Sequence, residues 1–366
     1  MRKIYDIILF HRETKGESFL RRLEGKNPLF ICAIGTTETA KIPSISAAGK
    51  FPELTDYTPP ADVELLLLGR CKCISGVPVT PEGIPTPAII TMSALKLANI
   101  PALVASGGLK VNPHVPFLDL GGKPGRDIRT GKAVENVKEV IQKAIIAGEN
   151  LAGTADCLVI GESIPGGTTT ALGVLLAMGV DARGKVSSSM PGNPHELKIN
   201  TVEAGLKALG AEFGAFVSDP VKAISCVGDP MVPAFAGLVM GAASKVPVLM
   251  AGGTQMSAVL AVVKALKRAV LDNVAIGTTR WIILDKTADL KGIVTQIADV
   301  PILAADLDFS QSRFDGLKAY EAGMVKEGVG AGGAAIAAMM KSGGSVTKET
   351  LLREIERNYE QLVGSK

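Results

Sequence analysis

The 366-residue sequence has no unbroken apolar run long enough to cross a membrane. Its longest apolar region, residues 231–266, is interrupted by Pro233, Lys245 and Pro247. Basic residues form no stripe, because 39 Lys and Arg are scattered among 36 Asp and Glu and the net charge is only +3. These absences argue against membrane and nucleic-acid partners, and they favour small molecules as ligands.

A metal-binding motif is also missing. The five cysteines have no zinc-binding spacing, and three of them lie in or beside apolar runs, as expected for reduced thiols in the cytoplasm. Histidine occurs three times, and nothing in the sequence pairs His195 with a carboxylate or a nucleophile. We therefore expect a cytoplasmic protein without a metal site, in which His195 is structural.

Short apolar runs that end in glycine or a small residue alternate with helical segments along the chain. This alternation indicates an α/β fold with a doubly wound, mostly parallel, Rossmann-like sheet, which we place at residues 55–315. An amphipathic segment at residues 134–147 is one expected helix. The expected strands are residues 63–69, 101–108, 156–161, 245–253 and 281–284.

The two ends of the chain have a different pattern. Residues 347–362 predict an amphipathic helix that Thr347 can cap, and the glycine-rich residues 328–335 separate it from the main domain. We expect residues 1–54 and 316–366 to form a small helical domain together.

Residues 158–173, LVIGESIPGGTTTALG, indicate a strand, a glycine-rich loop and the start of a helix, which is how phosphate sites are built. The loop lacks both the lysine of a P-loop and the three-glycine Rossmann spacing. With residues 106–110 and 251–255 it should lie at the carboxyl edge of the sheet, where ligands bind in such folds. The alternative is that these glycines only end strands and begin helices.

Three charged residues have both a functional and a structural interpretation. Glu162, in the glycine-rich loop, is either a countercharge or hydrogen-bond acceptor for a ligand, or a solvated or capping carboxylate. Lys198, in the first turn of a helix, either supplies the positive charge that the loop lacks or lies solvated on the surface. Glu327, among apolar residues and glycines, is either a desolvated general base or part of a surface Lys-Glu pair.

In order and approximate spacing, residues 60–335 resemble the nicotinate-nucleotide:dimethylbenzimidazole phosphoribosyltransferase family, in a divergent, archaeal-like branch. The family signature Gly-Glu-Met-Gly-Ile-Gly-Asn-Thr-Thr is matched at Gly161, Glu162, Gly166, Thr168 and Thr169. The late signature Leu-Gly-Glu-Gly-(Thr/Ser)-Gly-Ala is matched from Glu327 to Ala331, with Val325, Lys326 and Val329 differing. A Pro-Val strand leading to Asp-Gly is similar to residues 247–252, and residues 73–92 are loosely similar to the segment that helps to hold the benzimidazole.

The resemblance implies phosphoribosyl transfer from nicotinate mononucleotide to a base such as 5,6-dimethylbenzimidazole, giving α-ribazole phosphate and nicotinate. It also implies a homodimer, and no metal or cofactor, since the pyridinium glycoside is already activated. Two alternatives are a non-catalytic nucleotide-binding or regulatory protein and an enzyme that acts on another phosphosugar. The implied phosphate and ribose contacts are Gly166, Gly167, Thr168, Thr169 and Lys198, the nicotinate side is Glu162, Gly252 and Gly253, and the catalytic base is Glu327.

Overall fold

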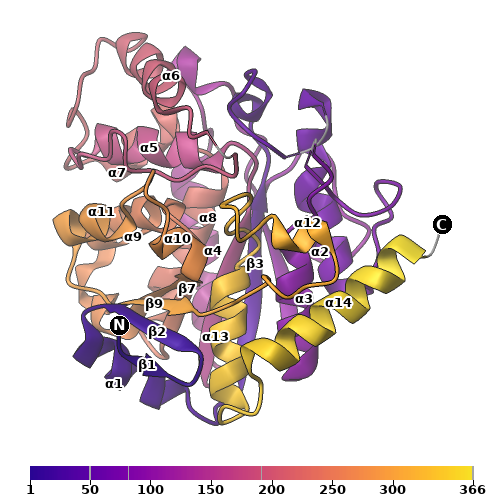
Figure 1. The fold of residues 1–366 in the computed structure, drawn as a ribbon. Helices are drawn as coiled ribbons and strands as arrows, with labels where there is room; N and C mark the ends of the chain where they lie inside the picture. The colour runs from indigo at the N-terminus through magenta and orange to yellow at the C-terminus, as the bar shows by residue number, and fades with distance from the viewer. Residues whose placement is uncertain (49–50, 81, 191, 365–366) are drawn as a thin grey trace.

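The central sheet is mostly parallel, as predicted (Figure 1). The computed structural model describes residues 1–48, 51–80, 82–190 and 192–364, and within them nine strands form one sheet in the order β1-β2-β9-β8-β7-β6-β3-β4-β5. Neighbours from β9 to β5 run parallel, whereas β2 pairs antiparallel with both β1 and β9. The strands are β1 (Lys3–Ile4), β2 (Ile7–His11), β3 (Pro28–Gly35), β4 (Ala102–Gly108), β5 (Leu118–Asp119), β6 (Cys157–Ser163), β7 (Val248–Ala251), β8 (Val274–Thr279) and β9 (Ile302–Ala305).

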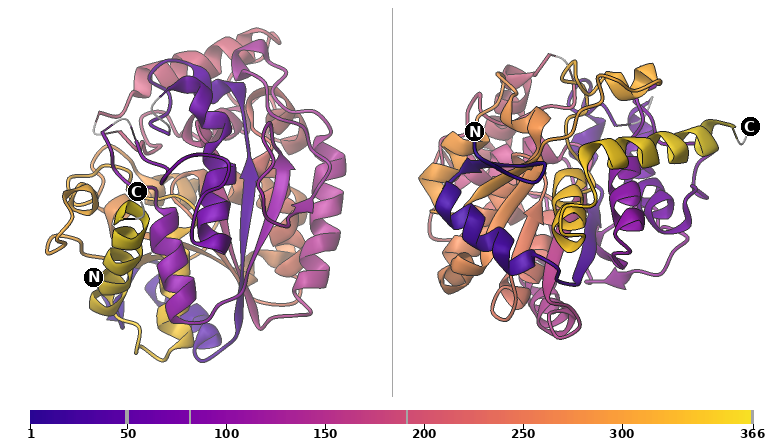
Figure 2. Two further views of the ribbon diagram at one scale, coloured as in Figure 1. Left: turned by 90° about the vertical axis from the view of Figure 1, so that its right-hand side faces the viewer. Right: turned by 60° about the horizontal axis from the view of Figure 1, so that its bottom comes forward.

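Helices cover both faces of the sheet (Figure 2). Strand β3 shows the reason, since Leu29 and Ile31 belong to one hydrophobic core while Phe30 and Cys32, with the opposite orientation, belong to the other. One face carries α1 (Glu13–Leu23), α2 (Thr58–Leu68), α3 (Ala88–Leu97), α13 (Ala331–Lys341) and α14 (Lys348–Gly364). The other carries α4 (Val137–Leu151), α5 (Gly167–Ala177), α6 (His195–Lys207), α7 (Pro220–Val227), α8 (Met231–Ala242), α9 (Gln255–Lys267) and α11 (Leu290–Ile297).

Short helical turns complete the connections between these elements. The α-helical turns are α10 (Arg280–Ile283) and α12 (Asp315–Lys318). The 3₁₀ turns are η1 (Glu38–Lys41), η2 (Pro52–Asp56), η3 (Ile128–Thr130) and η4 (Arg268–Asn273). No helix in the described part of the chain is long and apolar enough to span a membrane.

The order of the strands creates a crevice between β3 and β6. From β3 the chain continues to β4 on one side, and it then returns to β6 on the other side before β7, β8 and β9 follow outwards. Helices that connect strands on opposite sides diverge at such a point, so the carboxyl ends of β3 and β6 border an open space. The loop after β6, which begins at Ile164, lies beside it.

Several predicted elements are confirmed and two are wrong. Strands β4, β6 and β7 and helix α4 lie where the patterns predicted them. Residues 63–69 are not a strand but the end of α2, whose residues from Pro59 to Leu66 are all buried, so no helical periodicity shows. Residues 281–284 lie mainly in α10, because the strand of that region is β8, directly before it.

The two ends of the chain meet, but residues 1–54 are not a helical unit. The Lys348 amide donates to Asp6 Oδ2 (3.0 Å), and Thr347 Oγ1 accepts from the Thr350 amide (3.3 Å), which is the predicted cap of α14. However, the N-terminal segment supplies three strands, and β3 lies inside the sheet between β6 and β4. The expected boundary at residue 55 is therefore corrected, because the buried run at residues 28–35 belongs to the main sheet.

Candidate active site

A cavity of about 860 Å³ lies at the carboxyl ends of the strands and carries three carboxyl groups. They belong to Asp62, Glu162 and Glu327, and among the described lining residues none is Lys, Arg or His. A bound anion therefore depends on backbone N–H groups and hydroxyls at the wall. The polar wall is formed by Ser163, Gly166, Gly167, Thr168, Ser188, Ser189 and Gln255, and the apolar wall includes Ile45, Leu54, Tyr57, Ile74, Val77, Val79, Ile84, Tyr359, Leu362 and Val363.

The N-terminus of α5 opens into this cavity, as the glycine-rich loop predicted. Gly166 precedes the helix with φ of 76°, a left-handed conformation that favours glycine, and a Cβ there would approach Ala40 Cα to 3.0 Å. Gly166, Gly167 and Thr168 line the cavity. The exposed N–H groups and the dipole of a helix N-terminus attract anions, so this wall suits a phosphate.

Two buried polar atoms close to α5 have no hydrogen-bond partner within the described chain. They are Thr169 Oγ1 and Gln255 Oε1. Buried polar groups are normally paired, so each has a hydrogen bond to offer a ligand or a water. The Thr169 hydroxyl can donate to an anion, and the Gln255 carbonyl oxygen can accept from a sugar hydroxyl.

Glu327 faces the cavity from the loop between β9 and α13. Its Oε1 accepts from the amides of Gly328 and Gly332, both at 3.2 Å, and its Oε2 accepts from Thr278 Oγ1 at 3.4 Å. Burial raises the pKa of Glu327 to about 7, and these hydrogen bonds limit the rise. A carboxylate that titrates near neutral pH is suited to general base catalysis.

The other two carboxyl groups of the cavity are more deeply buried. Burial raises the pKa of Glu162 well above its usual value, and the charges of Glu327, Asp229 and Asp62 raise it further. The raised pKa favours the protonated form of Glu162, which repels an anionic ligand less than a carboxylate does. Asp62 accepts from Thr86 Oγ1 and Ser163 Oγ, both at 2.7 Å, and burial raises its pKa to about 6.

Lys198 is not a surface lysine, but it does not line the cavity either. Its side chain is fully buried, and its Nζ donates to the Ser187 carbonyl (2.6 Å) and to Asn193 Oδ1 (3.1 Å). It therefore lies behind the loop whose Ser188 and Ser189 line the cavity. Burial lowers the pKa of Lys198 to about 7, Lys326 lowers it further, and Asp285 opposes this shift.

The remaining predicted residues occupy mixed positions. Gly252 and Gly253 are buried at the end of β7, outside the lining, whereas Gln255 of the same loop reaches the cavity. Thr169 lies inside the first turn of α5. Residues 106–110 reach the same edge of the sheet without lining the cavity, and of residues 73–92 the described parts 74–80 and 84–87 do line it, while residue 81 lies outside the described chain.

Several site residues were missed at the level of sequence. Asp62 lies directly before residues 63–69, which were expected to form a strand, and Ser188 and Ser189 lie in a loop without a pattern. Tyr359 belongs to the apolar stripe of the amphipathic helix expected at residues 347–362, to which we assigned no part in the site, yet it reaches the cavity from α14. The four-residue neighbourhood Thr86-Asp62-Ser163-Glu162 joins α2, β6 and the segment before α3, and no local motif could have indicated it.

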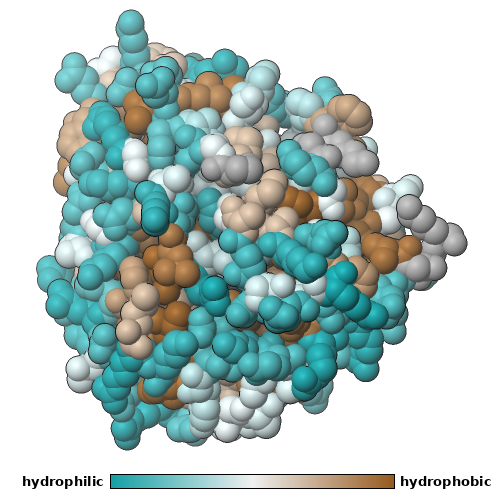
Figure 3. Space-filling view, in the orientation of Figure 1, coloured by the Kyte–Doolittle hydropathy of each residue, from teal (hydrophilic) through white to brown (hydrophobic). Residues whose placement is uncertain are grey.

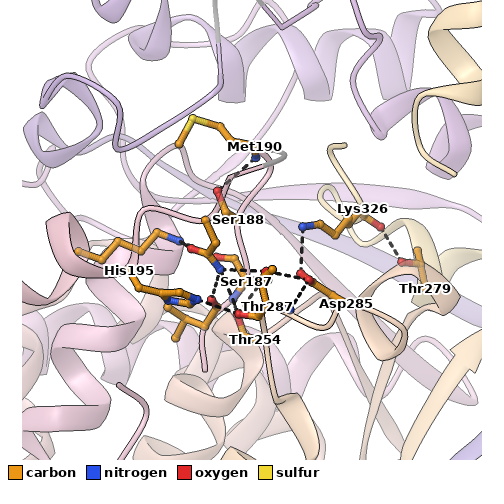
Figure 4. Close-up of polar contacts among 12 residues, drawn as sticks. Ser187, Ser188, Met190, His195, Thr254, Thr279, Asp285, Thr287 and Lys326 are labelled. Carbon is orange, nitrogen blue, oxygen red and sulfur yellow. Dashed lines mark hydrogen bonds and ion pairs between the residues drawn. The ribbon is translucent and has the colours of Figure 1, made fainter. Parts of the chain in front are cut away.

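The described residues include no group of three or more His, Cys, Asp or Glu side chains that could hold a metal ion. The polar contacts behind the cavity instead form a network of ion pairs and hydroxyls (Figure 4). Lys326 points toward Asp285, and Thr254 contacts Ser187 through its hydroxyl at 3.0 Å. This network connects the loop before α6 to the loop that carries Glu327.

Comparisons with known proteins show the family of the chain. Residues 106–280 match the family model of a phosphoribosyltransferase. A UPF0284 protein of Sulfolobus acidocaldarius is 46% identical over 352 residues, which cover 94% of this chain and 100% of that protein. A UPF0284 protein of Methanothermobacter thermautotrophicus is 47% identical over 327 residues, covering 88% of this chain and 90% of that protein.

Solved structures resemble the chain in fold. CobT from Thermus thermophilus has a TM-score of 0.61 at 16% identity, with 96% of this chain and 92% of that chain covered. A structure of nicotinate-nucleotide-dimethylbenzimidazole phosphoribosyltransferase from the same organism has a TM-score of 0.54 at 16% identity, with the same shares covered. The predicted α/β class and the resemblance to this family are confirmed.

Proposed function

Since this chain belongs to the UPF0284 family and is a phosphoribosyltransferase, we propose that it transfers the phosphoribosyl group of nicotinate mononucleotide to an aromatic base such as 5,6-dimethylbenzimidazole. The products are nicotinate and α-ribazole phosphate, the nucleotide of the cobalamin lower ligand. One observation carries the proposal: a single cavity has the N-terminus of α5 at one wall and Glu327, with a pKa of about 7, at another.

In the proposed complex the donor's phosphate lies at the N-terminus of α5. Gly166 and Thr168 offer it backbone N–H groups, whereas Gly167 lines the same wall with its N–H donated to the Ile164 carbonyl at 3.1 Å. The Thr169 hydroxyl is a further donor in the first turn. Lys198 contributes positive charge from behind residues 187–189, through the Ser187 carbonyl that it contacts. We assign Glu162 to the nicotinate side, with Gly252 and Gly253 behind the cavity lining at the end of β7.

The reaction exchanges one C–N bond for another at the ribose C1′. The bond to nicotinate breaks and its electron pair stays on the nicotinate nitrogen, so positive charge develops at C1′. One nitrogen of the acceptor attacks the opposite face of the sugar and forms the new bond, while the proton on its other nitrogen passes to Glu327 Oε2 or Oε1. Positioning both substrates in one cavity and removing this proton are the two contributions of the protein.

The apolar wall suits the acceptor better than the donor. Tyr57, Ile74, Val77 and Tyr359 offer apolar and aromatic surface to a planar base. Figure 3 shows apolar surface next to the C-terminal end of α14, where Leu362 and Val363 border the cavity. Burying a planar aromatic base against such surface is favourable by the hydrophobic effect.

The test is to incubate the pure protein with nicotinate mononucleotide and a panel of bases that includes dimethylbenzimidazole and adenine. Nicotinate release and a new nucleotide, measured by chromatography and mass spectrometry, are expected only when an accepted base is present. Binding of nicotinate mononucleotide without turnover by any base would contradict the proposed reaction. If the protein acts only on a different phosphosugar, the assignment of the phosphate site stands, and nicotinate mononucleotide is not the donor.

We also propose that the chain is a cytoplasmic homodimer. The homodimer follows from the resemblance, and the location follows from the unpaired thiols of its cysteines. Light scattering of the pure protein should give twice the chain mass of 38.0 kDa. A mass equal to one chain would contradict the dimer and leave the proposed reaction unaffected.

A further inference from the structure

The backbone around Glu327 is strained at residues that are not glycine. Val325, Lys326 and Val329 have φ values of 67°, 54° and 53°, in the left-handed region. For a β-branched residue such as valine this conformation is a genuine outlier, and it persists only where the surroundings hold it. Such strain therefore requires specific contacts that fix residues 325–329, which we call the base loop.

Backbone hydrogen bonds tie the base loop to two walls of the cavity. The Val325 amide donates to the Ser189 carbonyl (2.9 Å), and the Val329 amide donates to the Glu162 carbonyl (2.9 Å). Between them, the Lys326 and Glu327 amides donate to the carbonyls two residues earlier, at 2.8 and 2.6 Å. These two tight turns are centred on Val325 and Lys326 and account for the positive φ values of both residues. Glu327, which follows them, lines the cavity.

Lys326 is held from both ends of the residue. Its carbonyl accepts from Thr279 Oγ1 at 2.5 Å, and its Nζ lies 2.9 Å from Asp285 Oδ2 (Figure 4). Both side chains of this ion pair are only 5% exposed. Asp285 is fixed in turn by Thr287, whose amide and hydroxyl donate to Oδ1 at 2.9 and 2.7 Å.

We propose that the buried Lys326–Asp285 ion pair positions the general base by clamping the base loop in its strained conformation. The inference rests on the proposed function, because it takes Glu327 to be the base. Lys326 does not touch the cavity, so it acts through its neighbour Glu327 as a positioning residue. The related signature has glycine at this place, where left-handed backbone needs no clamp; here the ion pair replaces that freedom.

The test compares three substitutions of Lys326 in the full-length protein. Lys326→Met keeps the aliphatic chain and removes the charge, Lys326→Gly also relieves the backbone strain, and Lys326→Arg keeps the charge. The control is Lys96→Met, since Lys96 pairs with Glu354, a carboxylate 7% exposed, at 3.2 Å in a place that does not line the cavity.

We expect Lys326→Met to lower kcat by about 10- to 100-fold, because small displacements of a reacting group cost this much. Lys326→Gly should lose less, because glycine adopts the left-handed conformation without the ion pair. The KM for nicotinate mononucleotide should change by less than about threefold, since the N-terminus of α5 is untouched. Lys326→Arg should recover most of kcat, and Lys96→Met should behave as wild type. A fall in thermal stability with unchanged kcat would show that the pair is only structural and overturn the proposal.

Hydrogen exchange separates this inference from the proposed function. Peptides that cover residues 324–331 should exchange faster in Lys326→Met than in wild type and Lys96→Met, because the hydrogen bonds donated by the Val325 and Val329 amides lose their fixed geometry. This measurement needs no substrate. If wild type catalyses no transfer, the proposed function fails while the exchange result still decides whether the pair clamps the loop. Unchanged exchange in both Lys326→Met and Lys326→Gly would overturn the clamp.

Discussion

At the scale of single residues, Glu327 is the group on which the proposed chemistry depends. Its carboxyl accepts from two backbone amides and one hydroxyl, so it is held in place without a cationic partner. A carboxylate paired to a lysine or arginine has a low pKa and is a weak base, whereas burial without such a pair gives Glu327 a pKa of about 7. The same hydrogen bonds explain why a conservative substitution can leave the fold intact.

We predict that Glu327→Gln removes transfer while it preserves the binding of nicotinate mononucleotide. The glutamine oxygen can still accept from the Gly328 and Gly332 amides, but the amide takes no proton. The loss should be about 10²- to 10⁴-fold in kcat, measured by nicotinate release at saturating substrates. Turnover within about threefold of wild type would make Glu327 a structural carboxylate.

The pH dependence of the reaction should report the same group. Only ionised Glu327 accepts the proton, so kcat/KM for the acceptor should rise with pH and level off above about pH 7. Below that value it should fall by about tenfold per pH unit. Glu162 and Asp62 face the same cavity, and burial raises the pKa of both carboxyl groups. A profile that is flat from pH 5 to 8 in wild type would contradict the assignment.

Lys198 gives a prediction that separates direct from indirect action on the phosphate. Its Nζ contacts the Ser187 carbonyl, so Lys198→Met, which keeps the length and removes the charge, should weaken nicotinate mononucleotide binding by about tenfold. A lysine that contacts the phosphate directly would cost up to about 150-fold. Calorimetry with the donor and with the free acceptor distinguishes direct and indirect action from misfolding, because misfolding would weaken the binding of both ligands equally.

At the scale of elements, sequence patterns located the strand, loop and helix of the phosphate wall, whereas residues 73–92 of the apolar wall were indicated only by the resemblance. Residues 158–173 predicted β6 and α5 because glycine must occupy the left-handed position at Gly166. The segment at residues 63–69 was misassigned, since α2 is buried on every side from Pro59 to Leu66 and its apolar run matches a buried strand as well as a helix. Local pattern therefore identifies elements where backbone geometry is demanding and fails where burial hides the period.

Gly166→Ala tests the entry of α5. The substitution forces an L-residue into a left-handed conformation and brings a Cβ to 3.0 Å from Ala40 Cα, so stability should fall by about 1–2 kcal/mol. Donor affinity should fall as well, because the first N–H groups of α5 move. Gly25→Ala is the matched control, with φ of 67° and nothing within 4 Å of the added Cβ. Equal donor affinity in the two variants would show that the N-terminus of α5 does not bind the phosphate.

At the scale of the whole molecule, one cavity is assembled from segments that lie hundreds of residues apart. Asp62 comes from α2, Glu162 from β6, Glu327 from the loop before α13, and Leu362 from α14. The sequence predicted that Glu162 and Glu327 would belong to one site only through the resemblance, since no spacing in a chain of this length indicates contact. The addition of α14 to the cavity could not be predicted, because its apolar stripe is the same whether it covers a core or a ligand.

This arrangement predicts that the C-terminal helix affects the acceptor and not the donor. Leu362 borders the cavity at the apolar wall, away from the N-terminus of α5. Leu362→Ala should therefore raise the KM for an accepted base by about three- to tenfold, because the loss of a few buried methyl and methylene contacts costs on the order of 1 kcal/mol. The KM for nicotinate mononucleotide and the kcat should stay within about twofold of wild type. Leu266→Ala is the matched control, because Leu266 on α9 is 41% exposed and does not line the cavity. If both variants change the KM for the base and the KM for nicotinate mononucleotide alike, α14 acts on stability alone. The acceptor must then bind deeper in the cavity, beside Asp62 and Thr86.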